Sequence, residues 1–218
     1  MTKLTAIRFV LKPLVFVACL VPAVLVVTDL LEVTGSLAAN PIEDMLDRFG
    51  IWGIRFACVA LAVTPLRKLT GWNWLSRFRR PLGLFAFFYV LMHFLVWLLL
   101  DRELVASGFG IAGPLIVEDI VERPFITVGF IAFVLLLSLA LTSTVGMRRR
   151  LGRRWQQLHY GAYVAGLLGV WHYWWQVKND ASDPQIYAAI LAALLGYRLF
   201  DAIRRRKRTP TRAAPQTP

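Results

Sequence analysis

The sequence is poor in the residues that build catalytic and metal-binding sites. Its 218 residues include two Cys and three His. Cys19 and Cys58 both fall in apolar segments, which argues against a disulfide or a cysteine-ligated metal and favours packing. The sequence has no Gly-rich dinucleotide fingerprint and no soluble module for a nicotinamide cofactor, which argues against a self-contained NADPH oxidase. The three histidines remain the main candidates for chemistry.

The sequence also lacks a polar stretch long enough to form a soluble domain. Hydrophobic residues make up 57% of it, with eight Trp, which predicts one all-α integral membrane domain at residues 1–208. About 20 apolar residues cross the roughly 30 Å hydrocarbon core. Six apolar runs predict a bundle of six transmembrane helices, at residues 9–31, 51–66, 81–100, 125–145, 155–175 and 185–203. Pro65 is expected to end the second helix, and Gly113 and Pro114 to act as turn residues in an acidic loop at 101–123. Residues 209–218 are expected to form a disordered cytoplasmic tail.

Acidic residues are scarce, with 13 Asp and Glu against 25 Lys and Arg. Nearly all of them fall before the second helix, in the connection 101–123, or after the fifth helix, whereas basic residues cluster at 67–80, 148–154 and 204–208. The positive-inside rule therefore predicts that both termini are cytoplasmic. The net charge of +12 is then explained by orientation and by contact with the lipid bilayer, and no nucleic acid partner is expected.

All three histidines lie in predicted membrane helices: His93 in 81–100, and His159 and His172 in 155–175. The last two are 13 residues apart, or roughly 20 Å along a straight helix. One metal centre with three histidines is thereby excluded unless that helix breaks. Both helices run outward, so we expect His159 near the cytoplasm, His172 near the outside and His93 nearer the middle. Depth alone does not choose a partner for His93.

Histidine is costly in a membrane, which makes each of the three a functional hypothesis. A haem bound by two imidazoles from neighbouring helices would explain such residues. Zinc or copper binding, a proton relay in a small transporter, and a structural anchor whose histidines only form interhelical hydrogen bonds are the alternatives. A reducible b-type spectrum would separate the haem protein from a transporter, which should be colourless.

Two segments carry a family resemblance: RRPLGLFAFFYVLMHFLVWL at 79–98 and LHYGAYVAGLLGVWHYWW at 158–175. They resemble the ferric-reductase-like transmembrane domain of ferric reductases, NADPH oxidases and metalloreductases. Within that group the chain is most similar to haem-binding membrane subunits of bacterial periplasmic methionine sulfoxide reductase systems. The resemblance implies haem b and FMN as cofactors, with His93 and His172 as axial ligands of the haem iron.

The same resemblance gives His159 the place of an inner-haem ligand in two-haem relatives. Arg79 stands where the second ligand of that haem is expected, so His159 is interpreted as a cofactor-binding residue near flavin, quinone or a differently ligated haem. Arg55 and Arg198 also lie inside predicted helices and could bind an anionic cofactor group. Snorkelling, or a contact between Arg198 and Asp201 one turn on, is the favoured interpretation.

The function implied is that of an electron-transfer subunit in the bacterial inner membrane, and not of the catalytic subunit. Electrons would come from the quinone pool or from a cytoplasmic flavin reductase. They would pass to a periplasmic molybdopterin-containing catalytic subunit, in a heterodimer that repairs methionine sulfoxide in exported proteins. A transmembrane ferric or metal reductase is the nearest rival.

Overall fold

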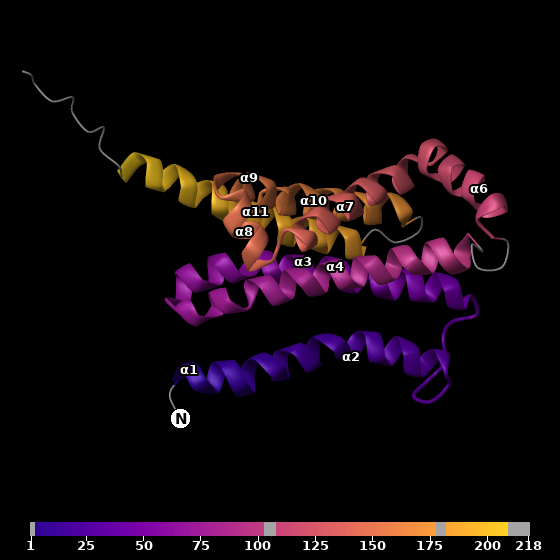
Figure 1. Cartoon of the computed structure of the whole chain (residues 1–218), viewed down its shortest axis with the longest axis horizontal. Helices are drawn as coiled ribbons and strands as arrows, with labels where there is room; N and C mark the ends of the chain where they lie inside the picture. The colour runs from indigo at the N-terminus through magenta and orange to yellow at the C-terminus, as the bar shows by residue number, and fades with distance from the viewer. Residues whose placement is uncertain (1–2, 103–107, 178–181, 209–218) are drawn as a thin grey trace, which may run out of the picture.

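The computed structural model describes residues 3–102, 108–177 and 182–208, and every regular element in these ranges is a helix. Three layers are visible in Figure 1. The middle layer is an antiparallel pair, α3 (Pro41–Thr70) and α4 (Arg79–Val96). One side is covered by α7 (Pro124–Leu141), α10 (Gly161–Gln176) and α11 (Ser182–Arg208), and the other side by α2 (Lys12–Leu30). The most extensive helix contacts join α3 to α4 and α7 to α10.

Within the described residues, five helices are long and apolar enough to cross a membrane, so the chain is a multi-pass membrane protein. They are Ile7–Leu30, Pro41–Thr70, Arg79–Asp101, Pro124–Leu141 and Ser182–Arg205. The remaining expected span, 155–175, is the fifth in chain order and is interrupted where α9 (Arg153–His159) gives way to α10. Tyr160 between them keeps helical dihedral angles, φ −69° and ψ −21°. The interruption is therefore one residue long and the chain continues in a helical conformation.

The second helix is longer than the predicted 51–66. It begins at Pro41 because the Asn40 side chain accepts a hydrogen bond from the Glu43 amide and proline suits the first helical position. Pro65 was expected to end the helix but lies inside it. The helix continues to Thr70, where Gly71 at φ 74° forms a left-handed C-cap. Proline was a poor stop signal here because membrane helices tolerate it.

The connection 101–123, expected to be an acidic loop, contains the helix α6 (Phe109–Glu122). The prediction was wrong because Pro114 and its neighbouring glycine were interpreted as turn residues, and they lie within this helix. Asp119 anchors α6 to the bundle. Its side chain is buried and forms ion pairs with Arg102 at 2.8 Å and with Arg123 at 3.0 Å.

The remaining boundaries differ less from the predictions. The first span begins as α1 (Lys3–Ala6) and a π-helix η1 (Ile7–Leu11), and the third ends in a π-helix η3 (Trp97–Asp101), one residue past the predicted end. The fourth span ends at Leu141, and a separate α8 (Val145–Leu151) follows because the Thr144 side chain caps it. A short 3-10 helix η2 (Asn73–Arg77) precedes α4. The predicted tail, 209–218, lies outside the described residues.

Tyr89 joins the first span to the middle layer. It is fully buried, and its hydroxyl donates to the Cys19 carbonyl at 2.7 Å and accepts from the Ala23 amide at 3.1 Å. The hydroxyl is thus inserted into the hydrogen-bond ladder of α2 beside Pro22, which has no amide hydrogen. This one contact satisfies backbone groups that lipid could not.

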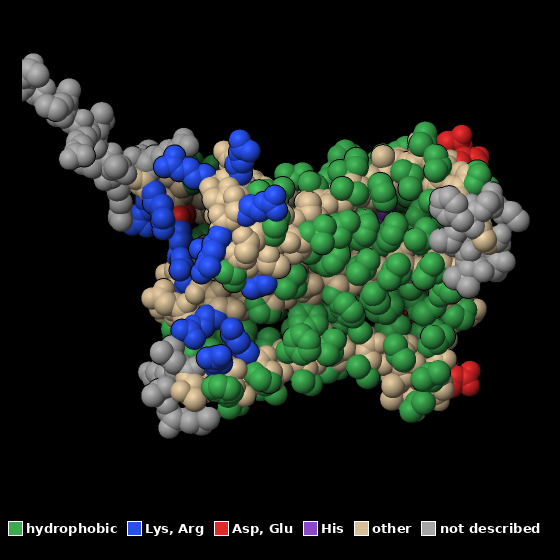
Figure 2. All heavy atoms as spheres, in the orientation of Figure 1, with side chains coloured by type: hydrophobic (Ala, Val, Ile, Leu, Met, Phe, Trp, Pro, Cys, Tyr) green, Lys and Arg blue, Asp and Glu red, His purple; other side chains and the backbone are tan. Residues whose placement is uncertain are grey.

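Charged side chains gather at the two ends of the molecule. In Figure 2 most of the Lys and Arg side chains in view lie at one end and most of the Asp and Glu side chains in view at the other, with hydrophobic side chains covering the length between them. We call these the basic end, where α8 with its three consecutive arginines lies, and the acidic end, where α6 lies. An apolar belt between two charged caps is the arrangement that a bilayer requires.

Candidate functional site

His93 from α4 and His172 from α10 meet inside the bundle. Their ring centroids are 6.1 Å apart and the ring planes form an angle of 83°. Both rings line one cavity of about 430 Å³ between the middle layer and α7 and α10. His159 is not among the residues that line this cavity.

Each ring of this pair is fixed by one backbone carbonyl. His93 Nδ1 donates to the carbonyl of Leu46 in α3 at 2.8 Å, and His172 Nδ1 donates to the carbonyl of Phe125 in α7 at 2.7 Å. A carbonyl oxygen can only accept, so Nδ1 carries the hydrogen and Nε2 carries a lone pair. Histidines that bind metals are commonly fixed in this way by a hydrogen bond from the other nitrogen.

A glycine lies under each ring, one helical turn beyond the carbonyl. A Cβ added to Gly50 would lie 3.2 Å from His93 Nδ1, and one added to Gly129 would lie 2.8 Å from both Nδ1 and Cε1 of His172. A side chain at position 129 would therefore collide with the His172 ring, and one at position 50 would require the His93 ring to shift by a few tenths of an ångström. Sequence reasoning missed both glycines, although a glycine within an apolar membrane helix is a recognised sign of close approach.

The cavity changes from apolar to charged along its length. Its deeper wall is formed by apolar side chains, among them Ile54, Val90, Phe94, Phe133 and Leu136. Phe94 and Phe133 stack with their centroids 4.4 Å apart. Its mouth, at the acidic end, carries polar and charged side chains: Asn40, Glu43, Asp47, Asp101, Arg102, Arg123 and Gln176. The cavity therefore suits an amphipathic ligand with one apolar and one charged edge.

The residues of this cavity fit a haem. Two imidazoles that bind one metal atom from opposite sides, through bonds of about 2 Å, place their ring centres about 6 Å apart. Within the described ranges, no group of three or more His, Cys, Asp or Glu could hold a metal ion. A two-imidazole site in an apolar pocket matches bis-histidine ligation of haem iron better than a compact zinc or copper centre.

His159 has different surroundings, near the basic end. The Thr142 hydroxyl donates to the Ser138 carbonyl at 2.7 Å, so its oxygen accepts from His159 Nε2, 3.2 Å away. The Trp155 ring stacks on the imidazole with centroids 3.9 Å apart. In His159 the hydrogen-bonded nitrogen is thus Nε2, whereas in His93 and His172 it is Nδ1.

Arg55 and Arg198, the two arginines considered as binding groups for an anionic cofactor, do not line the cavity. Arg55 donates to the Tyr187 hydroxyl at 2.9 Å, and its guanidinium lies over the Trp52 ring. Arg198 donates to the Tyr163 hydroxyl and to the Leu61 carbonyl, both at 2.7 Å.

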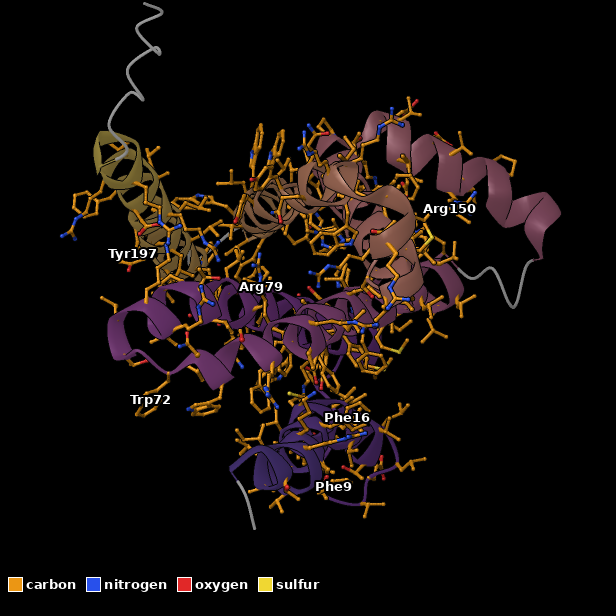
Figure 3. All side chains as sticks on the ribbon, turned by 60° about the vertical axis from the view of Figure 1, so that its left-hand side comes forward. Phe9, Phe16, Trp72, Arg79, Arg150 and Tyr197 are labelled. Carbon is orange, nitrogen blue, oxygen red and sulfur yellow. The ribbon has the colours of Figure 1, made fainter. Side chains whose placement is uncertain are left out.

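The favoured contact between Arg198 and Asp201 is not what the structure contains, because Asp201 pairs with Lys68 and Arg205. Arg79 lies between the middle layer and the layer of α10 and α11, as Figure 3 shows from the basic end.

Comparison with known proteins places the chain in a family of membrane proteins. The ferric reductase like transmembrane component family matches residues 49–170, a segment that contains His93 and His159 and ends just before His172. No solved structure matches the chain.

Several curated relatives share one name, protein-methionine-sulfoxide reductase heme-binding subunit MsrQ. The relative from Ralstonia nicotianae is 51% identical and covers 85% of this chain and 83% of its own length. Those from Xanthomonas oryzae pv. oryzae and Herminiimonas arsenicoxydans are 44% and 46% identical, over 99% and 91% of this chain and 97% and 88% of their own lengths. The chain therefore belongs to the ferric-reductase-like transmembrane family, within the group of heme-binding subunits of protein-methionine-sulfoxide reductases.

Proposed function

We propose that this chain is the haem b electron-transfer subunit of a methionine sulfoxide reductase system, with His93 and His172 as axial ligands of the iron. The observation that carries the proposal is the pair itself: two adjacent imidazoles, each with Nδ1 engaged by a carbonyl and Nε2 left for a metal. A bound haem iron supplies one-electron redox chemistry.

The protein's own groups prepare the site for that chemistry. The carbonyls of Leu46 and Phe125 hold the rings in place. The apolar wall around Phe94 and Phe133 keeps water away from the deeper part of the cavity. Burial, axial ligands and second-shell hydrogen bonds are the means by which a protein tunes a haem.

The topology proposed for this role has six spans and both termini in the cytoplasm. The pieces α9 and α10 together form the fifth span, because Tyr160 between them stays helical. The basic end then faces the cytoplasm of a bacterium and the acidic end faces the periplasm, as the positive-inside rule requires. The mouth of the cavity opens at the acidic end, on the side of an exported electron acceptor.

The partners proposed rest on the family. The name of the relatives refers to a protein-methionine-sulfoxide reductase, and we take the acceptor to be a periplasmic molybdopterin-containing catalytic subunit that forms a heterodimer with this chain. The donor is the quinone pool or a cytoplasmic flavin reductase. FMN as a second cofactor follows from the resemblance alone. His159, near the basic end, is the side chain we assign to the donor side.

The test begins with the full chain purified in detergent. A reducible b-type spectrum with bis-imidazole bands and a pyridine haemochrome signal are expected. A preparation that holds no haem, oxidised or reduced, would contradict the proposal and favour a transporter. Co-purification with a periplasmic oxidoreductase, and oxidation of the reduced haem on its addition, distinguish the proposed subunit from a ferric reductase, which would reduce Fe(III) chelates without that partner.

A further inference from the structure

The mouth of the cavity is lined by side chains of both charges. Arg102 and Arg123 are the cationic side chains that line it, and both lie where α6 meets the bundle. Three carboxylates line it as well: Glu43 and Asp47 from α3, and Asp101, which pairs with Arg102. An anionic ligand group at the mouth is therefore attracted by the two guanidinium groups and repelled by these carboxylates.

The two arginines share one buried carboxylate. Arg102 Nη1 lies 2.8 Å from Asp119 Oδ2, and Arg102 also pairs with Asp101. Arg123 Nε lies 3.0 Å from Asp119 Oδ1. The Asp119 side chain is 8% exposed, so it is a fixed anchor.

Arg123 forms fewer ion pairs than Arg102. Its ion pair with Asp119 engages Nε, and in the part of the chain that the structure describes no further ion pair of Arg123 is found. Its side chain is 52% exposed and lines the cavity. The two Nη groups of a guanidinium pinned through Nε present the pair of donors that a carboxylate binds bidentately.

We propose that Arg123 binds the carboxylate edge of the haem, and that Asp119 and Arg102 position it. The inference rests on the proposed function, since it needs a haem in the cavity. A haem is an apolar ring with two propionate carboxylates on one edge. The apolar wall inside and the guanidinium at the mouth give that ring one favourable orientation. The competing explanation is that Arg123 only ties α6 to α7 through its i,i+4 contact with Asp119.

The experiment compares two cofactors that differ only in the group concerned. Apoprotein of the full chain is reconstituted in detergent with haem b or with its dimethyl ester, in which both carboxylates are methylated. The rate of haem loss to excess apomyoglobin is measured for each. Arg123→Gln is compared with wild type, and Arg55→Gln is the control, because Arg55 bonds Tyr187 and does not line the cavity.

We expect Arg123→Gln to speed the loss of haem b about tenfold, the value of one charge-assisted contact, and to leave the loss of the ester nearly unchanged. Asp119→Asn should produce a smaller effect with the same dependence on free carboxylates, because it releases Arg123 without removing it. Arg55→Gln should change neither rate.

Equal acceleration of both cofactors by Arg123→Gln would show a purely structural tie, and no acceleration of either would also overturn the inference. If Arg123→Gln does not fold, Arg123→Lys, which keeps the charge but loses the bidentate donors, is expected to show the same selective effect on haem b, about threefold. A wild-type protein that holds both cofactors equally well overturns this inference alone, whereas a protein that holds neither also overturns the proposed function.

Discussion

The three histidines of this chain form two sites that differ in which ring nitrogen is engaged. In the cavity, His93 and His172 donate from Nδ1 to backbone carbonyls, and Nε2 stays free. Near the basic end, His159 donates from Nε2 to the Thr142 hydroxyl. The difference shows that the hydrogen-bond partner of a histidine decides which ring nitrogen stays available, and in the cavity this is Nε2, the nitrogen that the proposed iron ligation uses.

The hydrogen-bond acceptors of the histidines also differ in how freely they can move. A helix carbonyl is fixed by the backbone, and a glycine one turn on lets each ring lie against the neighbouring helix. A threonine hydroxyl rotates with its side chain, and the face of His159 is already covered by Trp155. The cavity pair is therefore preorganised, whereas His159 is bound into a local side-chain network.

The largest expected effect separates the two sites directly. Replacing His93 or His172 by Ala removes one of the two proposed iron ligands, so we expect total loss of haem in each variant by the pyridine haemochrome assay. His159→Ala should lose haem only in part or show altered reduction. Retention of haem by His172→Ala equal to that of wild type would contradict the pairing, whatever the result at His159.

The next effect tests the space under one ring. The Cβ of Gly129→Ala would lie 2.8 Å from two atoms of His172, so the ring must move and its bond to Phe125 must lengthen. Overpacking of this kind costs about 1–3 kcal/mol, so haem loss to apomyoglobin should be about tenfold faster. Gly83→Ala, where an added Cβ meets no atom within 4 Å, is the matched control and should leave the rate unchanged. Equal rates for Gly129→Ala and wild type would show that His172 has room to move.

Gly50→Ala, the equivalent substitution beside His93, should speed haem loss less than Gly129→Ala. The nearest atom to the Cβ of Gly50→Ala is His93 Nδ1 at 3.2 Å, which a shift of a few tenths of an ångström relieves. We expect the rate of haem loss to rise about twofold. This corresponds to a cost of under about 1 kcal/mol, below the usual range for overpacking. Electron paramagnetic resonance of the oxidised protein gives a second measure, because it responds to the orientation of axial imidazoles. An effect larger than that of Gly129→Ala would contradict the prediction that the His172 ring has less space than the His93 ring.

Sequence reasoning predicted the all-helical membrane fold because apolar runs of about 20 residues have few alternatives in a bilayer. It failed at Pro65 and at Pro114, where a turn rule learned from soluble proteins was applied to helices that tolerate proline. The meeting of His93 and His172 was expected from the family resemblance, since depth alone chose no partner, and ligation of iron by the pair stays a prediction. The carbonyls and glycines beneath the rings were missed because their role depends on which helices become neighbours.

The smallest effect tests whether the second site is energetically separate from the first. Thr142→Val keeps the shape of the side chain but removes the oxygen that accepts from His159 Nε2. The cost of a lost hydrogen bond is about 1 kcal/mol, and Thr142→Ser, which keeps the hydroxyl, is the control. We expect a lower melting temperature for the valine variant and an unchanged haem content, because no residue of this network lines the cavity. A loss of haem approaching that of His172→Ala would mean that the two sites hold one cofactor assembly, and the distinction between the two kinds of histidine would fall.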